Sequence, residues 1–415
     1  MRLGLISLHT SPLAEPGRAD AGGMNVVVHR VACQLARLGH DVEVFTRRSD
    51  PTTPDVQPIP PTDVAEDTDD GASARLITLP AGPATPLAKS AMEQTIEPFS
   101  AELHRYLSRA PRFDLLHSHH WFSGIAALPV ARAFNLPHVQ SFHSVAAPAG
   151  STELASGEPS ESPGRIAGER AIARDSDVVV AVSDVEAATI SERYGARRIE
   201  VARPGVGVEF FRPRTCPAPD HPYVLFAARL QPLKGADLAI EVFRHLRAAH
   251  PELHLIIAGD ASADFGQYPE QLRAAAASVG DAVEFVGACD RERLACLMRN
   301  ARLFVLPSWS ETFGLVALES QASGVPVIGW RGAGGLAEAI APSGLLMDDR
   351  DPATWAAAIT ELLTDDAAYR AACRDARAFA CTHTWHHTAE QLVQIYRDIL
   401  AARAKSAELE AGVRS

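Results

Sequence analysis

The sequence has few of the features that mark a secreted, membrane-bound or nucleic-acid-binding protein. Its six cysteines form no Cys-x-x-Cys pair, which argues against a disulfide framework and against a zinc site. It has no apolar run long enough to span a membrane, and its N-terminus lacks the basic region and apolar stretch of a signal peptide. Its 39 Lys and Arg stand against 51 Asp and Glu, a net charge of -12 that repels nucleic acid and anionic membranes. We therefore expect a cytoplasmic protein with no nucleic-acid partner and no membrane span.

The length and pattern of the chain predict two α/β domains. At 415 residues it exceeds the usual size of one folding unit, which favours two domains of about 200 residues each. Short β-branched runs alternate with helical patterns, as in βαβ units with a parallel sheet. The expected strands are 3–8, 42–45, 75–79, 115–117, 138–142, 178–182 and 199–202 in a first series, and 223–226, 253–258, 283–286, 303–306, 325–328 and 345–347 in a second.

A segment rich in proline and glycine, 203–222, separates the two series of strands. We therefore predict an N-terminal domain at 1–205, a C-terminal domain at 206–385, and a terminal helix and tail at 386–415. Two stretches rich in Pro, Ser, Gly and acidic residues, 51–74 and 147–164, are predicted to be mobile. The second follows a strand end, so it is either an acceptor lid or a solvated surface insertion.

The most specific motif is SETFGLVALESQASGVPVIGW, in which Glu311 and Glu319 flank an expected strand-to-helix junction. If the helix begins near residue 313, the amides of Gly314 and Leu315 lie at its N-terminus, where free N–H groups attract phosphate. Glu311 would then face a sugar and Glu319 a ribose, because carboxylates accept paired hydrogen bonds from hydroxyl groups. The alternative is structural, with Glu311 as a helix cap and Glu319 as an exposed helix residue.

Two cations follow the first strand of the second series, in ARLQPLKGADLAI. Arg229 and Lys234 fall at the carboxyl edge of the expected sheet, where α/β proteins bind ligands. The planar fork of Arg and the point charge of Lys suit a diphosphate, and together they would neutralise it as a leaving group. The glutamate pair favours this interpretation over two solvated surface cations.

Two other patterns suggest different chemistry. The histidines His117, His119 and His120 could be mistaken for a metal site, but a strand sends neighbouring side chains to opposite faces and no carboxylate or cysteine follows, so we expect no metal. GWRGAGGLAEAIA contains a G-x-G-x-x-A pattern that starts at Gly332. A nicotinamide fingerprint normally occupies the first βα turn of its domain, so we interpret this late loop as another turn that faces the diphosphate.

Together these motifs resemble the retaining glycosyltransferases of the GT-B fold, a large family that includes sucrose-phosphate synthases, glycogen synthases and mannosyltransferases. The resemblance runs through SLHTSP, DAGGMNV, RLGHDVEVFTR, HSHHWFSG, ARLQPLKG and PSWSETFGLVALESQASGVPVI, and so covers nearly the whole chain. It is closest to the mycothiol-pathway enzymes that join N-acetylglucosamine to inositol phosphate. It implies two Rossmann-like domains that face each other across a cleft, with the terminal helix packed back on the N-terminal domain.

The resemblance also implies a role for individual residues. The helix opened by Gly22 and Gly23 closes over the diphosphate, backbone near Cys289 holds the base, and His143 leans toward the donor sugar. The expected catalytic residues are Arg229, Lys234, Glu311 and His143; the donor-binding residues are Gly22, Gly23, Cys289, Gly314, Leu315 and Glu319; and the acceptor-binding residues are His9, Asn25, Lys89, His120, Ser144 and Arg165. For Lys89 and Arg165 a surface charge is the alternative.

The sequence departs from the mycothiol-pathway pattern at the acceptor site. His120 stands in HSHHW where those enzymes have a tyrosine, and the insertion 147–164 enters the same region. A shorter, titratable side chain thus replaces the phenol that would bind the inositol phosphate. We therefore predict a small polar or anionic acceptor for which inositol phosphate is not the best substrate, with a low-molecular-weight thiol or an antibiotic precursor as candidates.

The implied reaction transfers a sugar from a UDP or GDP sugar on one face of the ring. The leaving phosphate helps to deprotonate the acceptor, so no protein nucleophile and no metal or other cofactor is expected. The alternatives are a nucleotide-sugar epimerase of the same fold and a nucleotide-sugar-binding protein without catalysis, either of which would use a similar cleft. The expected partners are the two substrates, and a homodimer is compatible with the sequence.

Overall fold

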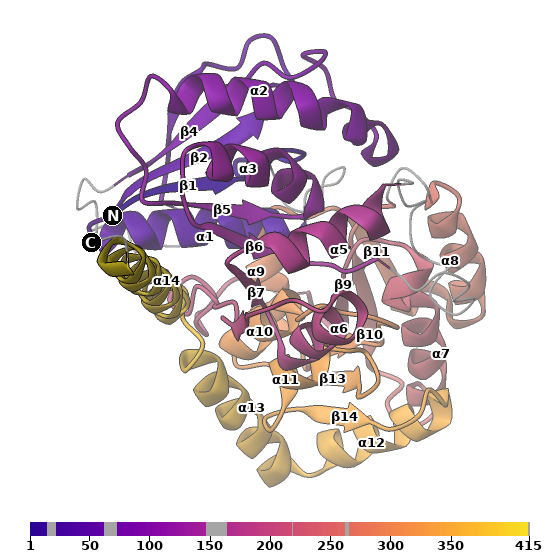
Figure 1. Ribbon diagram of the computed structural model, residues 1–415. Helices are drawn as coiled ribbons and strands as arrows, with labels where there is room; N and C mark the ends of the chain where they lie inside the picture. Colours follow the sequence, from indigo (N-terminus) through magenta and orange to yellow (C-terminus); the bar gives the residue numbers. More distant parts are fainter. Residues whose placement is uncertain (15–21, 62–72, 147–163, 218, 262–264, 414–415) are drawn as a thin grey trace.

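The computed structural model describes residues 1–14, 22–61, 73–146, 164–217, 219–261 and 265–413, which form two α/β lobes (Figure 1). The first lobe contains an eight-stranded sheet in the order β3-β4-β2-β1-β5-β6-β7-β8, and the second a six-stranded sheet in the order β11-β10-β9-β12-β13-β14. All neighbouring strands are parallel except β3, which pairs antiparallel with β4 at the edge. The predicted pair of α/β units is confirmed.

The strands of the first sheet are β1 (Arg2–Ile6), β2 (Asp41–Arg47), β3 (Val56–Ile59), β4 (Ala74–Leu79), β5 (Leu115–His119), β6 (His138–Ser141), β7 (Val178–Ala181) and β8 (Ile199–Val201). Those of the second are β9 (Tyr223–Ala227), β10 (His254–Ala258), β11 (Val283–Gly287), β12 (Leu303–Leu306), β13 (Val327–Trp330) and β14 (Leu345–Met347).

The helices of the first lobe are α1 (Gly23–Arg37), η1 (Lys89–Thr95), α2 (Ile96–Leu107), α3 (Trp121–Ala133), α5 (Arg165–Asp175) and α6 (Asp184–Tyr194). The second lobe has η2 (Pro232–Lys234), α7 (Ala236–Leu246), α8 (Tyr268–Ala276), η4 (Ala277–Ala282), α9 (Arg291–Asn300), α10 (Leu315–Ala322), α11 (Leu336–Ile340), α12 (Pro352–Thr364) and α13 (Asp366–Cys381), and α14 (Trp385–Val413) ends the chain.

Helices cover both faces of each sheet, and the apolar faces of the strands form the cores. In the first lobe one core contains Phe45, Phe99 and Phe122, and the core on the opposite face contains residues of α1 and α14. Several helices begin where a short polar side chain accepts a backbone N–H: Ser183 caps α6 and Asp290 caps α9. These caps fix where the helices start relative to the preceding strands.

The terminal helix α14 leaves the second lobe and packs on the first, beside α1 and near both chain termini (Figure 1). Trp385, Leu392 and Tyr396 are buried in the core beneath the first sheet. Arg403, farther along the helix, forms a two-pronged ion pair with Asp177, with N–O distances of 2.9 and 3.0 Å. The predicted return of this helix to the N-terminal unit is therefore confirmed.

Hydrogen bonds also join the two lobes directly. Ser183 Oγ donates to the Thr312 carbonyl oxygen at 2.9 Å. The carboxylate of Glu338, on α11, accepts the backbone N–H groups of Asp184 and Val185 at 3.1 Å each, at the start of α6. A helix N-terminus of one lobe thus receives an anionic side chain from the other, an arrangement that the helix dipole favours.

The predicted mobility of 51–74 is wrong for part of that segment. Val56–Ile59 forms β3, whose edge position accommodates Pro58 because an edge strand leaves N–H groups out of the ladder. Strand β13 also begins at Val327, two residues later than predicted. Residues 62–72 and 147–163 lie outside the described part of the chain, and the predicted acceptor lid falls among them.

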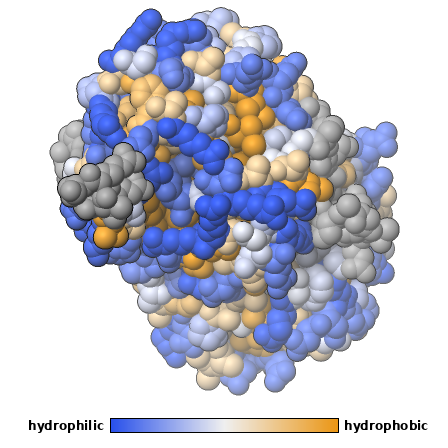
Figure 2. All heavy atoms as spheres, in the orientation of Figure 1, coloured by the Kyte–Doolittle hydropathy of each residue, from blue (hydrophilic) through white to orange (hydrophobic). Residues whose placement is uncertain are grey.

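The face of the molecule drawn in Figure 2 is mostly hydrophilic. On the face drawn in Figure 2, apolar residues occupy separate small areas between charged and polar ones. Large exposed apolar side chains are scattered over both lobes; in the described ranges they are Val56, Ile166, Val185, Trp309 and Leu409. Within those ranges we find no helix with both the length and the apolar character that crossing a membrane requires.

Candidate active site

A cavity of about 450 Å³ lies between the lobes, at the carboxyl ends of both sheets. On the first lobe the cavity is lined by residues that follow β1, β5 and β6 and by the start of α1. On the second lobe it is lined by residues that follow β9, β10, β11 and β12. All residues predicted as catalytic, donor-binding or acceptor-binding line this cavity. The fold brings them together because parallel strands carry the loops at their carboxyl ends to one edge of each sheet.

Lys234 and Glu311 form the centre of the second lobe's wall. Lys234 Nζ donates to Glu311 Oε1 at 2.7 Å, and Ser308 Oγ donates to the same oxygen at 2.8 Å. Both charged side chains are mostly buried, with 16% and 13% of their surface exposed, so solvent screens the pair only weakly. Lys234 therefore already neutralises a carboxylate, while Arg229 has no ion pair among the described residues and faces the cavity.

The loop that contains the G-x-G-x-x-A pattern forms hydrogen bonds with the backbone of Glu311. Glu311 N donates to the Ala333 carbonyl oxygen at 3.0 Å, and Gly335 N donates to the Glu311 carbonyl oxygen at 2.9 Å. Gly334 has φ +65°, and a Cβ on Gly335 would lie 2.1 Å from the Thr312 carbonyl oxygen. These glycines permit close backbone approach. The prediction that this loop faces the diphosphate is wrong, since it is not among the residues that line the cavity.

Glu319 is held by an arginine that the sequence analysis missed. Arg291 Nη1, at the start of α9, lies 3.3 Å from Glu319 Oε1, and its guanidinium lies over the rings of Phe210 and Phe211. Glu319 has 12% of its side chain exposed, which contradicts the alternative of an exposed helix residue. Arg291 is the first residue of an ordinary amphipathic helix, so the sequence gives no local signal for it.

The N-termini of two helices meet across the cavity. Helix α10 begins at Leu315 rather than near residue 313, after Gly314 with φ +104°. A Cβ on Gly23, the first residue of α1, would lie 3.3 Å from Leu315 Cδ1. The first amides of a helix have no partner within it, so both helices direct free N–H groups toward the cavity, a suitable arrangement for an anion.

Asn25 has a structural role beside its place in the wall. Its Oδ1 accepts Gly22 N–H at 3.3 Å at the start of α1, and its Nδ2 donates to the Ser11 carbonyl oxygen at 2.6 Å. The side chain thereby ties α1 to the loop after β1. Its predicted contact with the acceptor stays a prediction.

Arg165 is a buried cation, not a surface charge. Its side chain is 2% exposed, its Nε donates to Glu169 Oε1 at 2.7 Å, and its Nη2 donates to both Ser144 oxygens at 3.0 Å. The same carboxylate accepts Ala146 N–H and the Tyr194 hydroxyl. This network fixes the guanidinium where it reaches the cavity beside Lys89, which begins η1.

Histidines line the cavity on the side of the first lobe. The His9 and His120 rings lie 4.3 Å apart, and His119 Nδ1 lies 2.8 Å from His143 Nε2. Burial, with nearby Lys89 and Arg165, lowers the pKa of His9 to about 3, and burial lowers the pKa of His143 to about 4. Burial also holds the pKa of His120 well below its usual value. These imidazoles are therefore neutral at pH 7.

The rest of the histidine run is structural. His117 Nδ1 lies 2.6 Å from the Tyr396 hydroxyl oxygen and its Nε2 lies 3.0 Å from Ser141 Oγ, so both nitrogens are satisfied inside the core. Both ring nitrogens of His120, by contrast, lack a hydrogen-bond partner among the described residues, and the ring faces the cavity. An unpaired buried donor or acceptor is costly unless a ligand completes it.

The two halves of the chain match two family models. Residues 22–207 match the model of the glycosyl transferase 4-like domain, and residues 208–378 match that of the glycosyl transferases group 1. The chain is 39% identical to the D-inositol 3-phosphate glycosyltransferase of Acidothermus cellulolyticus, an alignment that covers 98% of this chain and 92% of that one.

Solved structures with the same architecture agree with this match. The structure of sucrose-phosphate synthase from Thermosynechococcus elongatus superimposes with a TM-score of 0.82 at 29% identity, over 97% of this chain and 99% of the other. The structure of Anabaena Alr3699/HepE in complex with UDP and glucose superimposes with a TM-score of 0.68 at 18% identity, over 95% and 98% of the two chains. At that identity the second likeness concerns the fold alone.

Proposed function

Because the chain belongs to the group 1 glycosyltransferases of the GT-B fold, we propose that its cavity transfers a sugar, with retention, from a UDP-sugar to a small phosphate-bearing acceptor. One observation carries the proposal: cations and helix N-termini converge on one side of the cavity, and a second cationic group with unpaired imidazoles lies on the other. The first group suits a diphosphate and the second a separate anion.

The donor side is assigned to the second lobe. Arg229, Lys234 and the amides at the start of α10 would bind the diphosphate, and Glu319, oriented by Arg291, would accept the ribose hydroxyls. We take a UDP sugar as the donor to test first, because the Anabaena structure, which shares this fold, contains UDP and glucose. Glu311, bound by Lys234 and Ser308 through Oε1, keeps its other oxygen for a sugar hydroxyl.

The proposed mechanism stabilises charge on the leaving group. When the bond between the sugar and the diphosphate breaks, negative charge grows on the phosphate, and preorganised cations and amides stabilise it there. The departing phosphate oxygen takes the proton of the acceptor hydroxyl on the same face of the sugar. His143 is neutral at pH 7, so it serves as a hydrogen-bond partner of the sugar and not as a cation. Metal is not needed for this step because Arg229 and Lys234 supply the positive charge.

The acceptor side is assigned to the first lobe. Arg165 and Lys89 would bind a phosphate group, and His9 and His120 would contact the ring that carries it. Inositol phosphate is the first candidate, since the relative of 39% identity is named for it. His120 supports a second candidate, a different anionic metabolite such as a low-molecular-weight thiol or an antibiotic precursor, because the imidazole does not reach as far as a phenol.

Steady-state competition between acceptors tests the assignment, with UDP-N-acetylglucosamine as donor and free inositol as the control acceptor. We expect inositol phosphate to exceed inositol in kcat/KM by at least about tenfold, the effect of one lost charge-assisted contact. His120→Tyr should raise kcat/KM for inositol phosphate if the shorter imidazole limits that acceptor. Equal kcat/KM for inositol and inositol phosphate would contradict a phosphate site. A higher kcat/KM for a thiol or an antibiotic precursor than for inositol phosphate would favour the second candidate acceptor.

A further inference from the structure

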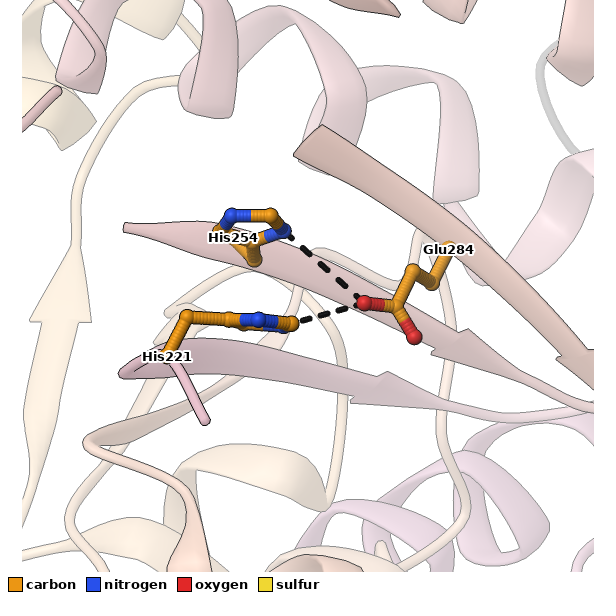
Figure 3. A group of neighbouring side chains, drawn as sticks. All are labelled: His221, His254 and Glu284. Atoms are coloured by element: carbon orange, nitrogen blue, oxygen red, sulfur yellow. Dashed lines mark ion pairs between the residues drawn. The ribbon is translucent and has the colours of Figure 1, made fainter. Parts of the chain in front are cut away.

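Three side chains of the second lobe form a cluster far from the cavity (Figure 3). His221 precedes β9, His254 opens β10, and Glu284 is the second residue of β11. Figure 3 shows both imidazoles turned toward one carboxylate oxygen: His221 Nε2 lies 2.9 Å and His254 Nδ1 lies 3.8 Å from Glu284 Oε1. One nitrogen from each ring and one carboxylate oxygen all fall within 4.8 Å of one another.

The cluster occupies the opposite end of the strands that build the donor site. Residues after β9, β10 and β11 line the cavity, whereas the three clustered residues stand at or before the beginnings of those strands. Each strand is five residues long, so at about 3.3 Å per residue the two places are separated by roughly 15 Å. A ligand at the cluster therefore cannot touch the donor.

The two imidazole nitrogens are available as metal ligands. His221 Nε2 and His254 Nδ1 are buried and form no hydrogen bond among the described residues; each meets Glu284 Oε1 only in the ion-pair contacts given above. A neutral imidazole offers the lone pair that a metal requires.

We propose that His221, His254 and Glu284 bind a divalent transition-metal ion, with Zn²⁺ as the best fit. Two imidazole nitrogens and one carboxylate oxygen are a donor set that Zn²⁺ accepts in a tetrahedral site, with water in the fourth position. Ca²⁺ and Mg²⁺ are disfavoured, since they take oxygen ligands. The ion ties the end of the segment that joins the lobes to two strands of the second sheet. The site is separate from the transfer reaction and does not depend on the proposed function.

Binding requires a small movement of the rings. The imidazoles are stacked, with centroids 3.5 Å apart and planes inclined by 21°, whereas a metal lies in the plane of each ring it binds. The rings must therefore turn about their Cβ–Cγ bonds until both lone pairs meet. About a quarter of each side chain is exposed, 27% for His221 and 26% for His254, so the turn displaces solvent and not core. The nearby Arg247 opposes a cation, and Glu284 favours it.

Isothermal titration of the untagged, chelator-stripped protein with ZnCl₂ alone tests the site. We expect one ion per chain with micromolar affinity, and a loss of at least about tenfold in affinity in both His254→Gln and Glu284→Gln. The matched control is His386→Gln, because His386 also pairs with a glutamate, Glu390 at 3.3 Å, but on the surface of α14. The control should bind like the wild type. Saturating Zn²⁺ should raise the melting temperature by about 5 °C in the wild type and the control.

Cobalt spectroscopy shows which atoms bind. Co²⁺ in place of Zn²⁺ should give the visible absorption of a tetrahedral nitrogen and oxygen site, absent from His254→Gln. An intense sulfur-to-cobalt band in the near ultraviolet would assign the ion to cysteines such as Cys216 or Cys296 and overturn the proposal. So would unchanged affinity in both variants of the cluster, equal loss in His386→Gln, or no binding to the wild type.

Discussion

At the level of single residues, lysine is the most informative. The whole chain contains three lysines, Lys89, Lys234 and Lys405, and two of them line the cavity between the lobes. In a protein with net charge -12, these two lysines place positive charge on the cavity wall, where it favours an anionic substrate. Lys234 lies against Glu311, so the pair orients the cation before the diphosphate arrives.

Removal of either donor-side cation should stop transfer without unfolding the protein. Lys234→Ala or Arg229→Ala should lower kcat by about 10² to 10³, the usual effect of the loss of one strong electrostatic stabiliser. The fold should persist because neither change opens a core cavity, and Glu311 keeps the Ser308 hydroxyl.

The matched control for this experiment is Lys405→Ala on the exposed surface of α14, which removes the same charge far from the cavity. Steady-state rates with matched melting temperatures give the comparison. Wild-type turnover in both cavity variants would show that the diphosphate lies elsewhere.

The sequence predicted which residues meet in the cavity better than how they interact. Glu311, Glu319, Arg229 and Lys234 could be found because each lies in a short motif at the end of an expected strand. The partner Arg291 could not, since tertiary packing brings it to Glu319 and no local pattern marks it. Ser308 lies three residues before Glu311 in the same motif, but the motif does not indicate its hydrogen bond to the carboxylate.

At the level of elements, α14 joins the two lobes. It follows α13 of the second lobe and runs along the first, where Thr388 Oγ1 donates to the Arg203 carbonyl oxygen, just after β8, at 2.8 Å, and Arg403 pairs with Asp177. Between them, Tyr396 is fully buried and its hydroxyl meets His117 at the centre of the first sheet. The helix thus anchors to a histidine that sits two residues before the strand end next to the cavity.

Tyr396→Phe should destabilise the protein by about 1 to 3 kcal/mol, because it leaves His117 Nδ1 buried without a partner. Urea unfolding followed by circular dichroism measures the change. His386→Gln, on the exposed side of the same helix, should change stability by less than about 0.5 kcal/mol. Equal stability of the two variants would mean that the buried hydroxyl contributes nothing.

The elements that the sequence predicted are those with strong local signals. Short apolar runs predicted β9 and β12 almost to the residue, because such buried strands are apolar on both faces. Strand β3 was missed because Pro58 and its polar neighbours resemble a loop, and only pairing with β4 makes the segment a strand. The GWRGAGG loop was predicted to face the diphosphate, but its glycines allow close packing against the backbone of Glu311. The spacing of the glycines in the sequence does not distinguish these two roles.

At the level of the whole molecule, buried neutral histidines link stability to pH. The pKa is lowered for His9, His117, His119, His120, His138 and His143, in each case chiefly by burial. In the native state these histidines stay unprotonated. In the unfolded chain they bind protons once the pH falls below their ordinary pKa of about 6.5. The stability that these groups contribute is therefore complete above pH 6.5 and falls as the pH falls toward their folded pKa values.

Near pH 6.5 the unfolded chain should bind about two more protons than the native protein. The six histidines are half protonated in the unfolded chain at this pH, so they bind about three protons on unfolding. Glu186, whose pKa burial raises to about 7, releases up to one proton on unfolding. The free energy of unfolding should then fall by about 3 kcal/mol per pH unit near pH 6.5. Urea titrations at intervals between pH 7.5 and 5.5 measure the slope. A flat profile would show that the histidines are not held neutral.

Same-face transfer from a nucleotide-diphosphate sugar without a metal is the central claim. The most direct test is proton NMR of the product formed from UDP-N-acetylglucosamine, with the acceptor that wins the competition, in excess EDTA. We expect an α-linked sugar, as in the donor, at the rate seen without chelator, because the cations and helix N-termini of the cavity stabilise the leaving group. A β-linked product, or activity lost in EDTA and restored by magnesium or manganese, would contradict it.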